Sequence, residues 1–305
     1  MQPIPLAVLG SANMDLVVYA AKAPAVGETV TGRAFRTVPG GKGANQAVAA
    51  ARAGGDVTMV GAVGTDDFGP RLRAALEHSG VGTDFLRTAE GPSGTAHVVV
   101  DDHGANSIVI IPGANGTVTG LGPGDETVIA GAYALLLQLE LPLPTVLAGA
   151  LAARRHGVRT LLTPAPATAM PEELLAATDV LVPNEHEAAA LTGLHDPLLA
   201  ARALLDQVPE VVVTLGAAGS AYVSRDAPDP VFVPAFPAEP VDTTGAGDTF
   251  VGALAVALGE GRAMPGALAW ASAAAALSVE RRGASTSMPY RQEIDACAQA
   301  RGAAR

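Results

Sequence analysis

Residues 241–253 read VDTTGAGDTFVGA, in which a glycine-rich turn runs directly into an alanine-rich helical pattern. Gly245, Ala246 and Gly247 are small enough for their backbone N–H groups to close around an anion, and the positive end of the following helix points at the same place. Asp248 then lies where an alcohol would lose its proton, so the turn has the outline of a phosphoryl-transfer site. Because an Asp in a first helical turn also favours the helix dipole, the turn alone is equally consistent with a capped helix start.

A second glycine-rich turn occurs at residues 39–50, PGGKGANQAVAA, and it also runs into a helical pattern. Its polar members include Lys42 and Asn45. Lys22 and Lys42 are the only lysines among the 19 Lys and Arg residues. Because nearly all other cationic positions are Arg, a lysine between glycines, where a compact ammonium fits and a guanidinium may not, favours a functional role for Lys42. The alternative is that Lys42 is a solvated loop lysine.

The composition indicates a large globular protein with an acidic surface. The 305 residues are 49% hydrophobic and only 4% aromatic, which suits helices packed on a sheet around one sizeable core. The net charge of −11 disfavours nucleic acid and anionic membranes as partners. The single cysteine, Cys297, cannot form an internal disulfide, no signal-peptide pattern precedes the first apolar run, and the apolar residues 263–279 are interrupted by Pro265 and Gly266. We therefore expect a soluble, cytoplasmic protein.

Short apolar runs alternate with longer helical patterns along the chain. The runs begin near residues 6, 57, 133, 159, 179 and 210, and the helical patterns cover residues 45–53, 69–78, 144–156, 185–191, 197–207, 248–258 and 266–280. This alternation predicts an α/β fold with a doubly wound, mostly parallel sheet and helices on both faces. Two stretches, about 15–37 and 95–111, alternate with a period of two and predict a small antiparallel β lid. We expect a single domain over residues 1–305, because no linker or repeat divides it.

Polar residues collect where the predicted strands end, which is where a doubly wound fold binds its ligands. They are Asn13, Asp15, Glu140, Asn184, Glu187 and Thr214, the last of which is followed closely by Gly216. Individually these residues have simpler explanations. Asn184 and Glu187 have the spacing of a helix capping box, Glu140 could be a solvated loop carboxylate, and glycine-rich strand exits are common.

Together these motifs resemble the ribokinase-like family of carbohydrate kinases over nearly the whole chain. The resemblance rests on GSANMDL from Gly10, VGETVTG from Val26, PGGKGANQAVAAAR, LLLQLE, TPAPA, LVPNEHEAAALTG, VVVTLGAAG, VDTTGAGDTF and SVERRGASTSMPYRQEID. The GAGD and GGKGAN turns are each fairly specific to the family, and the lysine in the second turn is closer to the ribose-phosphorylating members than to fructokinases or adenosine kinases.

The resemblance implies transfer of the γ-phosphate of ATP to the 5-hydroxyl of D-ribose. Asp248 would be the catalytic base, and residues 245–247 would form the anion hole. The residues implied to bind the sugar are Asn13, Met14, Asp15, Gly41, Lys42, Gly43, Asn45, Glu140 and Asp248. Those implied to bind the nucleotide are Asn184, Thr214, Leu215, Gly216, Ala217, Ala218, Gly219, Gly247 and Ser272.

Two metal ions are also implied by the resemblance. Asn184 and Glu187 would hold Mg²⁺ through its waters. A K⁺ ion would be bound, largely through backbone carbonyls, by Asp242, Thr244, Ser278, Arg281, Gly283 and Ser287. The simpler alternative is that Asp242 only caps a turn and Ser287 is a surface serine. Because lids of this family often pair, we also expect a homodimer formed through the lid.

Two other functions remain open at this stage. The same chemistry could act on 2-deoxyribose, another sugar or a nucleoside, since Met14 is bulky beside a sugar, although its side chain could equally point into the core. Ala217, Ala218 and Ser272 depart from the family pattern near the nucleotide and leave nucleotide affinity and base preference open. A non-catalytic sugar-binding regulator is disfavoured by the joint presence of Lys42 and Asp248. A dinucleotide-dependent dehydrogenase is disfavoured because no G-x-G-x-x-G follows the first strand.

Overall fold

The computed structural model describes residues 2–103, 105–227 and 229–302. Its body is built on a nine-stranded sheet in the order β13-β12-β11-β10-β9-β8-β1-β4-β5. Every pair from β11 to β5 is parallel, whereas β12 and β13 add an antiparallel edge. The strands are β1 (Pro5–Leu9), β4 (Asp56–Gly64), β5 (Leu86–Ala89), β8 (Ala134–Leu137), β9 (Arg159–Leu162), β10 (Val180–Leu181), β11 (Glu210–Thr214), β12 (Ser220–Ser224) and β13 (Val231–Val233).

Helices cover both faces of this sheet, as expected for a doubly wound fold. One face packs against α1 (Lys42–Arg52), α2 (Phe68–His78), α8 (Ala246–Gly259), α9 (Met264–Val279) and α10 (Arg291–Gly302). The other packs against α3 (Asp125–Gly131), α4 (Leu143–His156), α5 (Glu172–Ala176), α6 (Glu185–Thr192) and α7 (Pro197–Leu204). Strand β8 is continuously apolar because both of its faces are buried. Leu136 packs in the core on the α1 and α8 face of the sheet, whereas Leu135 and Leu137 pack in the core on the α4 face.

Small residues bring α1 and α8 unusually close together. A Cβ added at Gly252 would lie 2.7 Å from the Cβ of Ala49 and equally close to the backbone of α1. Only glycine therefore permits this helix spacing at that point. The close contact holds the N-terminal turns of both helices, which carry the two glycine-rich motifs, at one end of the body.

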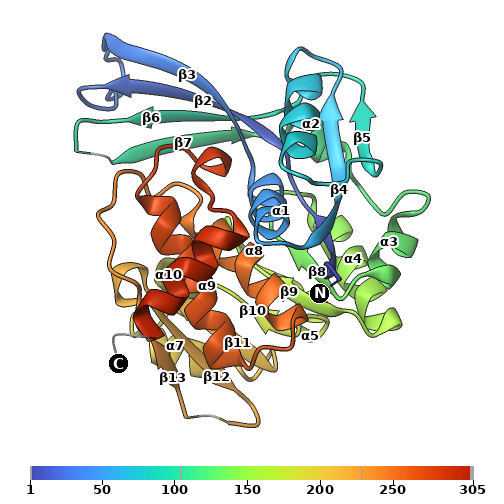
Figure 1. Ribbon diagram of the computed structural model, residues 1–305. Coiled ribbons are helices and arrows are strands. Elements are labelled where there is room, and N and C mark those ends of the chain that lie inside the picture. Colours follow the sequence, from blue (N-terminus) through green and yellow to red (C-terminus); the bar gives the residue numbers. More distant parts are fainter. Residues whose placement is uncertain (1, 104, 228, 303–305) are drawn as a thin grey trace.

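The lid is a separate four-stranded sheet in the order β3-β2-β6-β7, which runs across the top of Figure 1. Its strands are β2 (Asn13–Ala20), β3 (Gly32–Gly40), β6 (Gly94–Val100) and β7 (Asn106–Ile111). The two hairpins are antiparallel, as expected, but the central pair β2–β6 is parallel. The reason is topological: body elements separate the two hairpins along the chain, and the first strand of each hairpin leaves the body in the same direction.

Several elements carried too weak a local pattern to be expected. These are the short helices α3 and α5, the edge strands β5, β12 and β13, and the 3-10 turns η1 (Gly113–Thr117), η2 (Gly216–Ala218) and η3 (Ser285–Ser287). All of them span seven residues or fewer, which is too short for a clear hydrophobic period. Among the residues that the structure describes, none of the helices has the length and apolar character that a membrane span requires.

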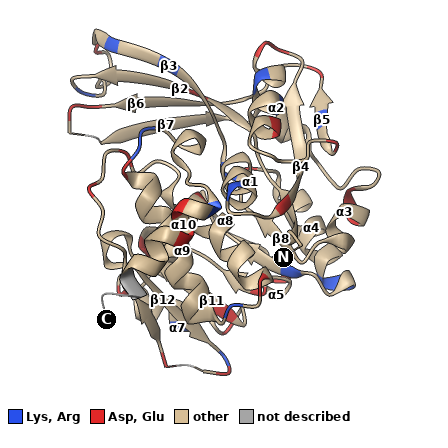
Figure 2. Ribbon diagram, viewed as in Figure 1, with Lys and Arg blue, Asp and Glu red and all other residues tan. Residues whose placement is uncertain are grey.

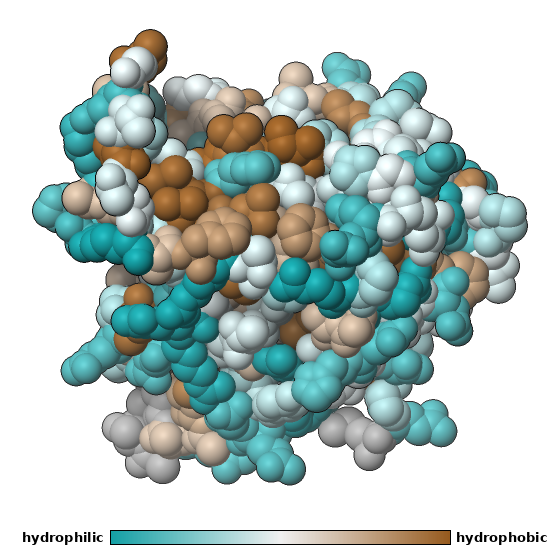
Figure 3. Space-filling model, turned by 90° about the horizontal axis from the view of Figure 1, so that it is seen from above, coloured by the Kyte–Doolittle hydropathy of each residue, from teal (hydrophilic) through white to brown (hydrophobic). Residues whose placement is uncertain are grey.

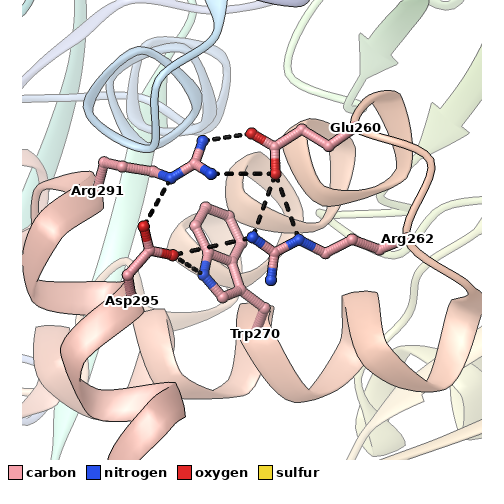
Figure 4. A network of polar contacts seen from close by, with 5 residues as sticks. All are labelled: Glu260, Arg262, Trp270, Arg291 and Asp295. Atoms are coloured by element: carbon pink, nitrogen blue, oxygen red, sulfur yellow. Dashed lines mark hydrogen bonds and ion pairs between the residues drawn. The ribbon is translucent and has the colours of Figure 1, made fainter. Parts of the chain in front are cut away.

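A polar network fastens α10 to the body (Figure 4). Glu260, whose side chain is 8% exposed, accepts hydrogen bonds from both Arg262 and Arg291. The two guanidinium groups lie 4.7 and 5.2 Å from the centroid of the Trp270 ring, and the indole N–H donates to Asp295 at 2.8 Å. The network ties together α9, α10 and the residues that follow α8.

Replacing Glu260 by Gln should lower the free energy of unfolding by about 2 kcal/mol, because two partly buried guanidinium groups lose their shared carboxylate. Denaturant unfolding at neutral pH measures the change. The exposed Glu90 offers a matched Glu→Gln control that should change stability little. Equal stability of the two variants would show that the network does not stabilise the docking of α10.

Candidate active site

The turn from β3 into α1 lies directly on the turn from β1 into β2. Gly41 has φ of 91°, and a Cβ built on it would lie 2.7 Å from the backbone nitrogen of Asn13. Ala44 N donates to the carbonyl of Ser11 at 2.8 Å. The glycines of the GGKGAN motif are thus required for this close approach, which brings Lys42 and Asn45 beside the first strand exit.

Glu140 joins three segments at this junction. One of its oxygens, Oε2, accepts from the backbone N–H of Lys42 at 3.1 Å, from Asn13 Nδ2 at 3.3 Å and from Ser11 Oγ at 2.5 Å. Asn115, on η1, donates to Asn13 Oδ1 at 2.7 Å and fixes that side chain from the other side. The carboxylate is therefore an organised part of the site rather than a solvated loop residue.

Asp248 lies at the N-terminus of α8 and is 8% exposed. Asn45 Nδ2 donates to its Oδ2 at 3.0 Å, and Gln46 Nε2 donates to its Oδ1 at 3.2 Å. Burial raises the pKa of Asp248 to about 6, although the charge of Lys42 and the two amide donors act in the opposite direction. The side chain is thus an acid–base group that titrates near neutral pH.

A second carboxylate of raised pKa faces Asp248 from the lid. Burial, with the negative charges of Glu140 and Asp248, raises the pKa of Asp15 to about 7. Burial alone would lower the pKa of Lys42, but the carboxylates of Asp248, Glu140, Glu187 and Asp15 outweigh it and raise that pKa. The ammonium is therefore a fixed positive charge among acidic groups.

The glycine-rich turn that begins α8 leaves open space at Gly247. Gly245, with φ of 75°, is the N-cap of α8 and has no side-chain capping bond, and a Cβ added at Gly247 would meet no heavy atom within 4 Å. The N-terminal amides of the helix have no side-chain acceptor, although Ala246 N donates to the carbonyl of Thr243 at 3.2 Å. They lie where the helix dipole would stabilise an anion.

A cavity of about 580 Å³ opens beside this turn. It is mostly apolar, and its lining includes Thr214, Gly216, Ala217, Gly219, Gly247 and Ser272. Its size suits a nucleotide. Three residues expected there are not among those that line the cavity: Asn184, Leu215 and Ala218. Leu215 packs against the core instead.

Met14 also departs from the expectation. Its side chain is fully buried (0% exposed) in the hydrophobic core of the α1 and α8 face. Successive residues of a strand point to opposite faces, so Met14 points away from the site that Asn13 and Asp15 share. The expectation that the Met14 side chain lines the sugar pocket is corrected by this placement.

Asn184 and Glu187 form the capping box that their spacing indicated. Asn184 Oδ1 accepts from Glu187 N at 2.8 Å, and Glu187 Oε2 accepts from Asn184 N at 2.9 Å. Burial raises the pKa of Glu187, which also feels the charge of Lys42. The capping box and a position facing the active site therefore coexist.

The segments that carry the expected K⁺ ligands lie together. Asp242 accepts from Thr244 N at 3.0 Å through Oδ1 and from Gly283 N at 2.8 Å through Oδ2. The hydroxyls of Ser278 and Ser287 donate to carbonyls of their own segments, and the side chain of Arg281 pairs with Glu293. Within the described ranges, no group of three or more His, Cys, Asp and Glu side chains is arranged to hold a metal ion. A cation here would therefore depend on backbone carbonyls.

Sequence reasoning missed four polar residues that organise the site: Ser11, Gln46, Asn115 and Gln138. Two of them carried a usable signal. Gln46 follows Asn45 in the GGKGANQA motif, and Gln138 interrupts an otherwise apolar strand exit in LLLQLE. A polar residue in such a place is a candidate for a buried hydrogen bond.

Comparisons with known proteins agree with this geometry. The model of the family described as pfkB family carbohydrate kinase matches residues 5–291. The chain is 44% identical to ribokinase of Bacillus subtilis over 95% of this chain and 98% of that protein, and 38% identical to ribokinase of mouse over 94% and 92%. A solved structure of Arabidopsis thaliana ribokinase complexed with ribose and ATP covers 97% of this chain and 99% of its own, with a TM-score of 0.91 and 36% identity.

Proposed function

The chain belongs to the pfkB family of carbohydrate kinases, and we propose from this premise that it transfers the γ-phosphoryl group of ATP to the 5-hydroxyl of D-ribose. The main support is the position of Asp248 at the N-terminus of α8, between the sugar-side residues and the nucleotide-sized cavity. Its carboxylate is buried, and burial raises its pKa to about 6. Similarity to ribokinases over nearly the full length supports ribose as the acceptor.

The transfer itself needs one proton acceptor and an anion site. Asp248 accepts the proton of the 5-hydroxyl as the hydroxyl oxygen bonds to the γ-phosphorus, and the bond from that phosphorus to the β–γ bridging oxygen breaks to release ADP. The amides of residues 245–247 stabilise the negative charge on the transferred group, and their loss would cost on the order of 3 kcal/mol of transition-state stabilisation.

The sugar-side residues can satisfy a polyol. Asp15 and Glu140 accept hydrogen bonds from hydroxyl groups, whereas Lys42 and Asn13 donate to them. Asn45 offers a specific acceptor: its Oδ1 is buried and has no hydrogen-bond partner among the described residues. A ribose hydroxyl would satisfy that oxygen, which otherwise carries a desolvation cost.

We propose two cation sites. Mg²⁺ would be held through its waters by Asn184 and Glu187, since the capping box uses Oε2 of Glu187 and leaves Oε1 for a water ligand of the ion. When bound, the ion would neutralise charge on the phosphates. K⁺ would be bound beside the anion turn by carbonyl oxygens of the segments that contain Asp242, Thr244, Ser278, Arg281, Gly283 and Ser287.

The dependence of kcat/KM on pH should report the ionisation of Asp248 and Asp15, the two carboxylates whose pKa is raised. We expect kcat/KM to rise with pH through about 6 to 7, because Asp248 must be ionised to accept a proton and the pKa values of Asp248 and Asp15 are about 6 and about 7. Initial rates at saturating Mg²⁺ and ATP, taken from about pH 5 to about pH 8, measure this. A flat profile over that range would contradict the role of Asp248.

The lid supports a proposal of a homodimer. The lid sheet has one face that carries Asp15 and another that points away from it. On the face that points away, Phe35, Val109 and Ile111 are 61%, 62% and 47% exposed. The view from above shows a hydrophobic patch over this part of the molecule (Figure 3), and β6 and β7 carry no charged residue (Figure 2). An apolar surface of this kind favours pairing of two lids.

Sedimentation at micromolar protein should therefore give twice the chain mass of 30.4 kDa. The variant Val109→Glu should shift the protein toward the monomer, because it would bury a carboxylate in the contact. A monomeric wild-type protein would contradict the proposal.

We also propose a cytoplasmic location, which agrees with the single, unpaired Cys297.

ADP release from Mg²⁺-ATP tests the function directly, with ribose, 2-deoxyribose, fructose and adenosine as acceptors and with K⁺ or Na⁺ present. The highest kcat/KM with ribose and a higher rate with K⁺ would support both the acceptor and the cation site. A different preferred acceptor would keep the chemistry and contradict ribose. No turnover with any acceptor would favour a sugar-binding regulator.

A further inference from the structure

Gln46 is a fully buried amide in contact with the proton acceptor. It is 0% exposed on α1, and its Nε2 donates to Asp248 Oδ1 at 3.2 Å and to Thr163 Oγ1 at 3.1 Å. Its Oε1 accepts from Gln138 Nε2 at 2.6 Å. The negative charge of Asp248 decides which end of the amide faces it, because the reversed amide would place two oxygens against each other.

The two oxygens of Asp248 are held by consecutive residues. Asn45 donates to Oδ2 at 3.0 Å, and Gln46 donates to Oδ1. One donor alone would leave the carboxylate free to rotate about its Cβ–Cγ bond, whereas two donors fix its plane. The lone pairs of Asp248 that accept neither hydrogen bond then point in a fixed direction. A fixed direction toward the reacting hydroxyl is a condition for efficient proton transfer.

Gln138 holds Gln46 in turn, and stability alone gives no reason for it. The residue follows β8 and is 1% exposed, and its Oε1 is buried without a hydrogen-bond partner among the described residues. A Cβ at Gly10 would collide with that oxygen, so Gly10 makes the space that Gln138 occupies. A buried carbonyl without a hydrogen bond is unfavourable for folding. The other end of the same amide, Nε2 of Gln138, makes the hydrogen bond to Gln46.

We infer that Gln46 is a positioning residue for the phosphoryl transfer, that it fixes the carboxylate plane of Asp248, and that Gln138 holds Gln46 in the required orientation. The inference rests on the proposed function. A hydrogen bond donated to the charged form also favours ionisation of Asp248. The other groups that face Asp248 are Lys42 from α1, Glu140 after β8 and Asp15 from β2; none of them is altered by changing Gln46 or Gln138.

Three variants test this arrangement: Gln46→Met, Gln138→Met and the double variant. Methionine keeps the length of the side chain and removes the amide. For Gln46→Met we expect kcat to fall about tenfold with KM for ribose nearly unchanged, and the pKa of Asp248 to rise by about one unit. Gln138→Met should act in the same direction with a smaller effect. The double variant should equal Gln46→Met, because both changes break one chain of contacts.

Two readouts are needed. An aspartate ¹³Cγ NMR titration of the unliganded protein follows the pKa of Asp248 without any assumption about the sugar, and the Asp248→Asn variant identifies its signal. Steady-state kinetics with ribose gives kcat and KM. The exposed Gln207, changed to Met, is the matched control and should leave both unchanged.

An Asp248 titration that is the same in wild type and in folded Gln46→Met would overturn the inference, as would a fall in kcat that multiplies between the two single variants. Should Gln46→Met fail to fold, Gln46→Glu replaces it, and its added negative charge should raise the pKa of Asp248 further. An inactive wild type whose titration still responds to Gln46 would contradict the proposed function but support the contact.

Discussion

Replacement of Asp248 by Asn should lower kcat by about three orders of magnitude, because the proton acceptor is lost while its neighbours remain. Ribose binding should change little, since Lys42, Glu140 and Asn13 keep their contacts with one another. Calorimetric binding of ribose and single-turnover ADP formation separate the two effects. Turnover close to that of the wild type would remove Asp248 from the mechanism.

The same variant should alter how stability depends on pH. The pKa of Asp248 is raised from 3.8 to about 6 in the folded protein, so between these values the folded state binds more protons than the unfolded state. The free energy of unfolding therefore falls as pH rises through this window, by on the order of 3 kcal/mol from this group. Asp248→Asn should show a correspondingly flatter profile between about pH 4 and about pH 8. The exposed Asp56, changed to Asn, is the control.

Replacement of Lys42 by Met should lower kcat/KM at neutral pH by at least about a hundredfold. The ammonium lowers the pKa of both Asp15 and Asp248 and is the opposing charge for four carboxylates. Without it, more of Asp248 is protonated at neutral pH, and the sugar also loses a donor. The rate should therefore recover partly as pH is raised toward about 9.

Lys22 offers the matched control, because it is the only other lysine and its side chain is 62% exposed at an ion pair with Glu28. Lys22→Met should leave the pH profile unchanged. The decisive measurement is the pH at which kcat/KM reaches half its maximum. If that pH is the same for Lys42→Met as for the wild type, the ammonium does not control the ionisation of Asp248.

Much of the fold could be predicted from local patterns. Continuous apolar runs such as ALLL in β8 indicated strands buried on both faces, and glycine-rich turns before α1 and α8 indicated where these helices begin. The lid was predicted from period-two alternation. Its parallel central pair was not, because strand direction depends on where each hairpin leaves the body rather than on its own residues.

The candidate site could be predicted in part. Asp248 and Lys42 stood out because each is a charged residue in a glycine-rich turn. Gln46 and Gln138 did not, because a single glutamine carries no local signal of its partner. For Met14 the sequence left two placements open, beside the sugar or in the core, and only the structure shows which face of β2 is the core.

The sequence by itself determined the doubly wound α/β fold and the two glycine-rich turns, and it singled out Asp248 as the proposed proton acceptor, because periodicity, glycine positions and helix starts are local properties of the chain. Only the tertiary structure decided the pKa values of Asp248 and Asp15, the reach of Glu140 to Ser11 and Lys42, and the contact of Gln46 with Asp248. These features join residues about 100 to 200 positions apart. They arise from burial and from the close packing of α1 on α8, and neither is encoded within a short segment.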